Sequence, residues 1–215
     1  MKKKMICLIL SLSMCITLCV PVFASDKSEA RSNSSISHTT NIINVSDMSV
    51  EQRKNAFQTH IDEVTTEVLA QNGTRGNLGY SKTEYGTVST NTIQGYPGDQ
   101  PTRGYSFGPL GGTVYFTETG GPTVTVSINA NLADYLSVSI AIPLGKMTST
   151  ATGYGCNIPG SSSTSPAYYK VYETKTVTIS PYVVYWRQTN LDPWQVARRG
   201  EHVEIVSVRA DAVKS

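Results

Sequence analysis

The segment from residue 123 to 142 alternates apolar and polar side chains, and this pattern constrains the fold more than any other feature of the chain. A period of two residues is that of a β-strand with one buried face. Both halves of the segment place apolar residues at even positions, so the simplest hairpin has an odd loop at Asn131-Leu132-Ala133 and pairs Ile128 with Leu136. The apolar row comprises Val124, Val126, Ile128, Ala130, Leu132, Leu136, Val138, Ile140 and Ile142.

The rest of the C-terminal half is also β in character. Stretches rich in Val, Ile, Tyr and Thr are separated by Gly, Pro and Ser clusters, which is typical of short strands. We expect a mainly β fold, an antiparallel β-sandwich or small barrel over about 110–215, preceded by one amphipathic helix and a disordered N-terminal tail. The expected strands are 113–118, 123–130, 134–142, 167–180, 182–189 and 201–209, with a bend at Pro181.

A single helix is expected within residues 48–72. Ser49 followed by Gln52 matches a capping box, and Asn72-Gly73 is typical of a helix end. Two roles remain open for its apolar face: it docks on the β domain, or it belongs to a propeptide or partner-binding arm. The residues of this face are Phe57, Ile61, Val64 and Val68.

Two segments flank this helix and show little periodicity. Residues 25–47 are rich in Ser, Thr and Asn, and they bury too little apolar surface to offset chain entropy, so we expect a disordered tail. Residues 73–112 are rich in glycine and are interpreted as a linker or loop, with one short strand near Glu84 to Thr92. The all-β domain then occupies residues 113–215.

Residues 1–24 have the order of a secretory signal peptide. Lys2, Lys3 and Lys4 precede an apolar run, and Val22-Phe23-Ala24 offers a cleavage site before Ser25. The apolar run is short for a membrane-spanning helix, which needs roughly 20 residues. We therefore expect a secreted, extracellular protein, in the style of exports from Gram-positive bacteria.

Charge and cysteine content limit the possible partners. Three of the 18 basic residues lie in the signal peptide and all 16 acidic residues lie beyond it, so the exported chain is close to neutral. Nucleic acid binding needs clustered basic residues and is not expected. Only Cys156 remains after cleavage, which excludes an intramolecular disulfide and predicts a free thiol or a bridge to another chain. The sequence places no constraint on the oligomeric state.

Aromatic residues are concentrated between residues 168 and 194. Tyr168, Tyr172 and Trp194 are the candidate ligand-binding residues, because exposed aromatic rings stack on sugars or anchor protein partners. The alternative is that these rings simply pack on the sheet, since Tyr and Trp favour strands.

No motif in the chain specifies a reaction. The sequence lacks the signatures of hydrolases, zinc proteases, P-loop proteins and calcium loops, so we expect no enzyme, no cofactor and no metal. The favoured interpretation is a non-enzymatic extracellular protein that binds a cell-wall or host glycan, or another cell-surface ligand.

A second interpretation starts from the 123–142 hairpin. Membrane-inserting hairpins alternate an apolar lipid face with a small polar face, and the lipid-facing residues here would be Val124, Val126, Ile128, Leu136, Val138 and Ile140. Each arm is expected to hold about 8 or 9 residues, against the 9–11 needed to span a bilayer. The protein would then be an exported pore-forming toxin or bacteriocin acting on a target membrane. Its N-terminal region, up to about residue 103, would be a pro-segment cut at Arg75 or Arg103.

Overall fold

Two long strands, β8 (Tyr169–Arg187) and β9 (Gln195–Lys214), form the antiparallel hairpin on which the rest of the chain is arranged. The computed structural model describes residues 36–74, 76–98, 100–116, 122–132, 135–145 and 154–215, all within one unit, 36–215. The expected signal peptide, its cleavage site at Ala24 and Ser25, and residues 25–35 lie outside the described residues.

Three further strands complete the central sheet. β1 (Ser37–Asn44) runs parallel to β9, whereas β2 (Tyr80–Tyr85) and β3 (Ser89–Gly95) both run antiparallel to β8. The strand order is therefore β1-β9-β8-β2, with β3 continuing along β8 beyond the end of β2.

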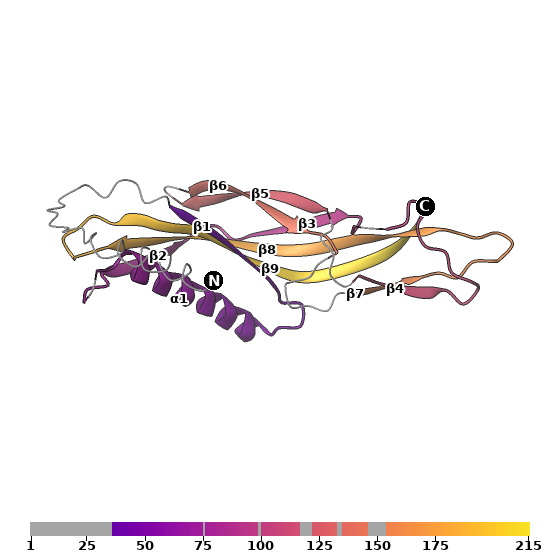
Figure 1. Ribbon diagram of the computed structural model, residues 1–215, viewed down its shortest axis with the longest axis horizontal. Helices are drawn as coiled ribbons and strands as arrows, with labels where there is room; N and C mark the ends of the chain where they lie inside the picture. The colour runs from indigo at the N-terminus through magenta and orange to yellow at the C-terminus, as the bar shows by residue number, and fades with distance from the viewer. Residues whose placement is uncertain (1–35, 75, 99, 117–121, 133–134, 146–153) are drawn as a thin grey trace, which may run out of the picture. The chain divides into compact units, whose positions relative to one another are not determined.

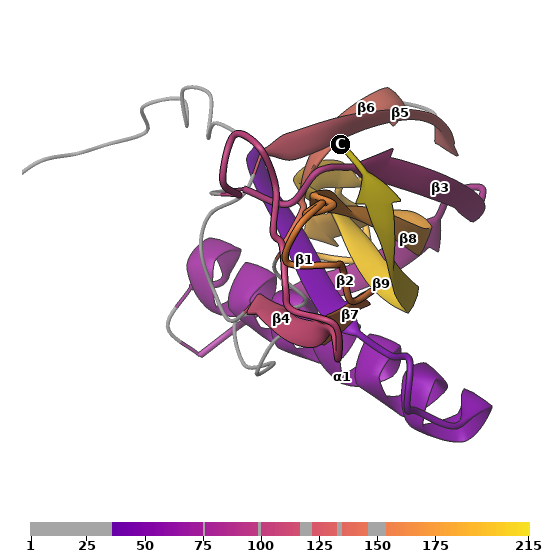
Figure 2. The ribbon, with the colours of Figure 1, turned by 90° about the vertical axis from the view of Figure 1, so that its right-hand side faces the viewer.

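Two small antiparallel sheets and one helix surround this central sheet. β4 (Gly112–Phe116) pairs with β7 (Tyr154–Ile158), and β5 (Thr123–Leu132) pairs with β6 (Tyr135–Pro143). The helix α1 (Val50–Asn72) covers one face of the central sheet, and the β5–β6 hairpin covers the other (Figures 1 and 2). The expected mainly β fold with one helix is confirmed, and the facing β layers are those of a sandwich.

The helix forms where the sequence predicts it. Ser49 accepts a hydrogen bond from the backbone N–H of Gln52, and the Gln52 side chain accepts one from the N–H of Ser49, which completes the capping box. Ile61, Val64 and Val68 are buried against Tyr182, Val184 and Trp186 of β8, and Phe57 packs beside them. The apolar face of the helix is therefore docked on the central sheet.

Two segments expected to lack structure contain strands instead. β1 lies inside the predicted tail 25–47, so the prediction of disorder is wrong for residues 37–44. β2 and β3 lie inside the predicted linker 73–112, where the sequence indicated one short strand. All three strands are too polar to show a clear alternation, and their pairing with β8 and β9 supplies the stability that local composition does not.

Pro181 does not divide β8, so the expectation of two separate strands, 167–180 and 182–189, is wrong. The Pro181 carbonyl accepts a hydrogen bond from Gly86, which lies in the gap between the end of β2 and the start of β3. The N–H that proline lacks would point toward the same gap, so no bond to a neighbouring strand is lost. The alternation of apolar and polar residues ends at Pro181 because both faces of β8 are buried from residue 181 to 186.

Candidate functional site: a hairpin docked on the central sheet

The β5–β6 hairpin buries the even-numbered face that its sequence predicts, but in a different register. Val126 pairs with Ile140 and Ile128 pairs with Val138, so the strands are shifted by two residues from the expected pairing. Leu136, which was expected in the core opposite Ile128, is instead 71% exposed on the polar face. The assignment of Leu136 to the apolar face is therefore wrong.

A bulge at the closed end of the hairpin explains this difference. Between the pairs Asn129–Ser137 and Leu132–Tyr135, two residues of β5 oppose one residue of β6. Asn131 within the bulge has a φ of 54°, a left-handed conformation that asparagine tolerates better than most residues. The extra residue brings the alternation of buried and exposed side chains on the two strands back into step. Leu132 and Tyr135 therefore both reach the core across a connection of two residues.

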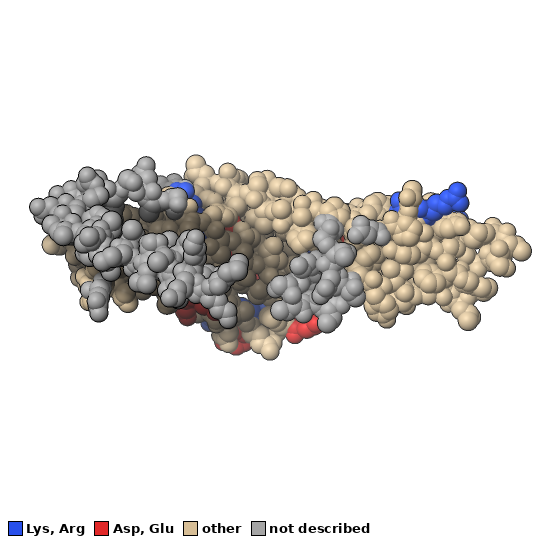
Figure 3. All heavy atoms as spheres, viewed as in Figure 1, with Lys and Arg blue, Asp and Glu red and all other residues tan. Residues whose placement is uncertain are grey.

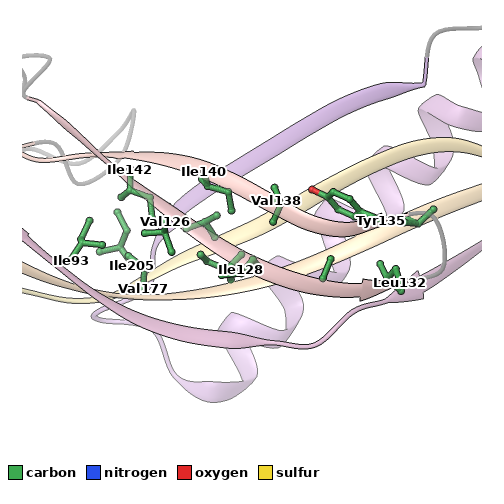
Figure 4. Packing of buried hydrophobic residues seen from close by; sticks show 14 of the residues in the cluster. Ile93, Val126, Ile128, Leu132, Tyr135, Val138, Ile140, Ile142, Val177 and Ile205 are labelled. Carbon is green, nitrogen blue, oxygen red and sulfur yellow. The ribbon is translucent and has the colours of Figure 1, made fainter.

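The apolar face of the hairpin packs on β8, β9 and β3. Figure 4 shows its side chains directed at residues of the central sheet such as Val177 and Ile205. From the hairpin the cluster contains Val126, Ile128, Ala130, Leu132, Tyr135, Val138, Ile140 and Ile142, with Val124 packed at its margin. This single apolar face accounts for most of the contact between the hairpin and the sheet.

The outward face of the hairpin is small and polar. Ser127 and Ser139 lie opposite each other with their hydroxyl oxygens 2.8 Å apart. The described residues 122–132 and 135–145 include no Asp, Glu, Lys or Arg, and Figure 3 shows almost no charge on the surface over β5 and β6. The exposed residues on this face are mainly Ser, Thr and Asn.

Few backbone bonds hold the hairpin to the central sheet. Within the described part of the chain, β5 and β6 pair only with each other. The N–H of Thr87 donates to the carbonyl of Ala130 at 3.0 Å, and Asn131 Nδ2 donates to Thr87 Oγ1 at 3.0 Å. The hairpin is thus a separate β layer, attached mainly by its apolar side chains.

A buried ion pair lies beneath the open end of the hairpin. Lys175 Nζ is 2.7 Å from Glu173 Oε1, both side chains are fully buried, and Lys175 also donates to the carbonyl of Pro143 at the end of β6. The N–H of Gly145 and the hydroxyl of Tyr154 donate to the other Glu173 oxygen. Burial lowers the pKa of Lys175, an effect that Glu173 opposes, and burial with the Glu173 carboxylate raises the pKa of Tyr154 far above its ordinary value.

A second polar cluster lies beneath the closed end. Glu201 of β9 is fully buried and accepts a hydrogen bond from Thr40 Oγ1 at 2.7 Å. His38 Nε2 lies 2.8 Å from Glu201 Oε1 and 3.1 Å from the Tyr135 hydroxyl of the hairpin. Both ends of the hairpin therefore rest on ionisable groups that belong to the sheet.

The sequence analysis did not identify these ionisable groups, although one signal was present. Glu173 and Lys175 stand on the same odd-numbered row as Val171 and Val177, so strand alternation already placed them on the core face. His38 and Thr40 gave no such signal, because parallel pairing with a distant strand brings them to Glu201.

The opposite face of the sheet is held by a different kind of contact. Arg53 and the partly exposed Glu67, both on α1, form ion pairs with Glu204 and Arg198 of β9. His202 of β9 is buried under the helix, and burial lowers its pKa to about 4. The helix is thus anchored by charged side chains of its own as well as by its apolar stripe.

A second buried histidine lies at this helix–sheet contact. His60 Nε2 is 3.0 Å from the Tyr182 hydroxyl, and the ring of His60 lies 5.6 Å from that of His202. Burial lowers the pKa of His60 as well. Both imidazoles are therefore expected to be neutral at pH 7.

The three candidate aromatic residues do not form one surface. Tyr168 and Tyr172 lie at the start of β8, whereas Trp194 lies beside the turn that joins β8 to β9. It is level with Arg187, which is roughly 50 Å along the strand from Tyr172 at about 3.3 Å per residue. Tyr172 contacts Tyr96 edge to face, with the ring centroids 5.0 Å apart. Trp194 has the guanidinium of Arg187 over its ring at 4.2 Å.

Cys156 forms no disulfide within the described residues, and it is buried beside Ile158 and Val171. Burial raises its pKa, so the thiol form dominates at pH 7. The described residues contain no group of three His, Cys, Asp or Glu side chains placed to hold a metal ion. In the same part of the chain, no helix is both long and apolar enough to cross a membrane.

Comparison with known proteins adds no assignment to this geometry. No protein-family model, curated protein or solved structure matches the chain.

Proposed function

We propose that this protein is a secreted, membrane-active protein that inserts the β5–β6 hairpin into a target bilayer. The observation that carries the proposal is the hairpin itself: a separate two-stranded sheet with one apolar face, one Ser/Thr/Asn face and no charge among its described residues. An element of this kind can exchange a protein core for a lipid core without moving a charge into either.

The dimensions of the hairpin support this function. β5 has 10 residues, longer than the arm expected from the sequence, and β6 has 9, and both lengths fall within the roughly 9–11 residues that a tilted strand needs to span a bilayer. The buried face, which includes Val126, Ile128, Val138 and Ile140, would face lipid, and the face that carries Ser127 and Ser139 would face water.

The site beneath the hairpin supports the same movement. Glu173, Lys175 and Glu201 are fully buried while the hairpin is docked. Departure of the hairpin would return these side chains to water, where ionised groups are best solvated. Because the inserted hairpin would still have two unpaired edges, several copies must join into a closed ring in the membrane.

A reversible lock tests the proposal. Thr87 and Asn131 are already in side-chain contact between the sheet and the hairpin, so Thr87→Cys/Asn131→Cys provides a disulfide that tethers the two layers. We expect the wild-type protein to release dye from vesicles of phosphatidylcholine and phosphatidylglycerol. The oxidised lock should abolish release, and a reductant should restore it.

The matched control places the disulfide inside the hairpin. Ser127→Cys/Ser139→Cys joins the two arms to each other but leaves the whole hairpin free to depart from the sheet. This variant should release dye when oxidised. Release by the oxidised Thr87–Asn131 lock, or no release by the wild-type protein, would disprove hairpin insertion.

An extracellular binding protein is the second candidate function, and one observation favours it. Tyr96 is exposed and packs edge to face against Tyr172, with the Lys170 ammonium 5.8 Å from the Tyr96 ring. An exposed ring packed on a half-buried one, beside a cation, is a suitable platform for a cell-wall or host glycan. Glycan binding that is lost in Tyr172→Ala and Tyr96→Ala, but retained in Trp194→Ala, would support this function.

A further inference from the structure

The turn between β8 and β9 presents an unusual apolar tip. Leu191 is 97% exposed, so its side chain makes almost no contact with the rest of the chain. Leu78 and Tyr80, in the segment that meets this turn, are exposed as well. Single exposed apolar residues are common on protein surfaces, and the surroundings of Leu191 decide whether this one matters.

Hydrogen bonds hold the turn in one conformation. Asp192 Oδ2 accepts from the N–H and the hydroxyl of Thr189, both at 2.7 Å, and the N–H of Leu191 donates to Thr189 Oγ1 at 3.3 Å. Arg187 donates to the carbonyl and to the side-chain oxygen of Asn190, both at 3.0 Å. The exposed leucine is therefore presented by an ordered turn, which lowers the entropy lost when it binds.

The side chains at the base of this turn are of the kinds that favour a membrane interface, and one of them, Trp194, also packs at the margin of the apolar cluster beneath the hairpin. The guanidinium of Arg187 lies 4.2 Å from the Trp194 ring centroid and 5.5 Å from that of Tyr80. The Tyr80 hydroxyl also accepts a hydrogen bond from Asn190 Nδ2 at 3.4 Å. Tyr and Trp rings collect at the level of lipid headgroups, and Arg keeps its charge there while its stem lies against apolar groups.

The position of the hairpin on the sheet shows which of its ends lies nearer to the tip. The open end of the hairpin contacts Lys175, and its closed end contacts Thr87 and His38, further along β8 toward Arg187. The closed end of the hairpin therefore points toward the same end of the central sheet as Leu191. A bilayer that met the tip would lie ahead of the hairpin.

We infer that the β8–β9 turn is the membrane-contact tip of this protein, with Leu191 entering the headgroup region of a lipid bilayer and Tyr80, Trp194 and Arg187 behind it. This inference rests on the proposed function, because it supplies the docking step before the hairpin moves. It assigns the surface to lipid and not to a protein receptor.

Flotation with protein-free vesicles of phosphatidylcholine and phosphatidylglycerol tests the inference. Leu191→Ser removes the apolar side chain without adding a charge and should weaken vesicle binding about tenfold, from the free energy of burying a leucine. Leu191→Trp should retain binding. Leu110→Ser is the matched control, because Leu110 is also fully exposed in a turn, 108–111, near the opposite end of β8, and it should bind like the wild type.

The oxidised Thr87→Cys/Asn131→Cys variant separates this inference from the proposed function. It should bind vesicles like the wild type and release no dye. If this oxidised variant binds vesicles through Leu191 but also releases dye, insertion of the hairpin is disproved, whereas membrane contact by the turn is still supported. Equal vesicle binding by the wild type and Leu191→Ser would overturn the assignment of the turn to lipid. Binding to cells only while their surface proteins are intact would also overturn it, and would assign the turn to a protein partner.

Discussion

The two faces of the central sheet are covered in different ways. α1 contributes charged residues to its contact, with Arg53 and Glu67 paired to side chains of β9. The β5–β6 hairpin contributes no charge among its described residues, and the ionic groups at its contact belong to the sheet. The two contacts therefore differ in where their charges lie: the helix brings charged side chains to the sheet, whereas the hairpin brings an uncharged apolar face. The comparison teaches that one sheet can hold one layer by ion pairs together with apolar packing, and the other by apolar packing alone over ionic groups of its own.

The largest expected effect tests the charges beneath the hairpin. Lys175→Met leaves the buried Glu173 without its cation and should lower the free energy of unfolding by about 3–5 kcal/mol, as for other broken buried ion pairs. Glu173→Gln/Lys175→Met removes both charges and should cost much less. Urea denaturation of the two variants measures the difference, and equal losses would show that the pair is not coupled.

The second-largest expected effect is a loss of stability in acid, which arises on the face of the sheet that the helix covers. Unfolded His202 binds a proton near pH 6.5, whereas the folded side chain binds it only near pH 4, so between these values the unfolded state holds more protons. Stability should therefore fall by about 3 kcal/mol as the pH drops from 6.5 to 4, at 1.36 kcal/mol per pKa unit. The groups that face His202 are His60, Phe57, Asn41 and Glu204.

His202→Gln is the variant that assigns this pH dependence. It removes the titrating group, so its unfolding free energy should change less between pH 6.5 and pH 4 than that of the wild type. Denaturation curves at both pH values measure the change. If the unfolding free energy of His202→Gln falls between pH 6.5 and pH 4 as much as that of the wild type, the acid sensitivity arises from another group, for example the neighbouring His60.

A smaller effect is expected at the start of the helix. Ser49→Ala removes the side-chain acceptor of the capping box and should destabilise the protein by about 1 kcal/mol. Ser49→Asp restores an acceptor at the N-terminus of the helix and should recover most of the loss. Thermal unfolding followed by circular dichroism measures both changes, and a shift in Ser49→Asp as large as that in Ser49→Ala would argue against capping.

The smallest expected effect tests the register of the hairpin. Leu136 faces outward, so Leu136→Ala should change the unfolding free energy by less than about 0.5 kcal/mol. Val138→Ala removes buried methyl groups from the core and should cost about 2 kcal/mol. A loss in Leu136→Ala as large as that in Val138→Ala would restore the register expected from simple alternation, in which both side chains are buried.

Local patterns predicted much of this fold. The capping box located the helix, and the even-numbered row of residues 123–142 located the buried face of the hairpin, because both signals lie within a few residues of the structure that they specify. The bulge at Asn131 was not predicted, since one extra residue changes the register without changing the composition.

The part of the central sheet that lies beneath the hairpin was harder to predict than the hairpin itself. His38 meets Glu201 across 163 residues of sequence, and no local pattern reports such a contact. β2 and β3 were hidden for the same reason, because partners on β8 stabilise their polar, glycine-flanked sequences. The apolar half of the candidate site and the inward direction of Glu173 and Lys175 were therefore visible in the sequence, whereas the contact of His38 with Glu201 depended on tertiary structure.

The parallel pairing of β1 with β9 also determines when the sheet can form. β1 is synthesised long before β9, so its backbone N–H and C=O groups have no strand partner until residues 198–205 have been made. Contacts this distant in sequence make folding slow, and they delay it until nearly the whole chain is available. The central sheet therefore acquires its parallel edge strand only when synthesis has almost reached the C-terminus, although that strand lies among the earliest described residues of the chain.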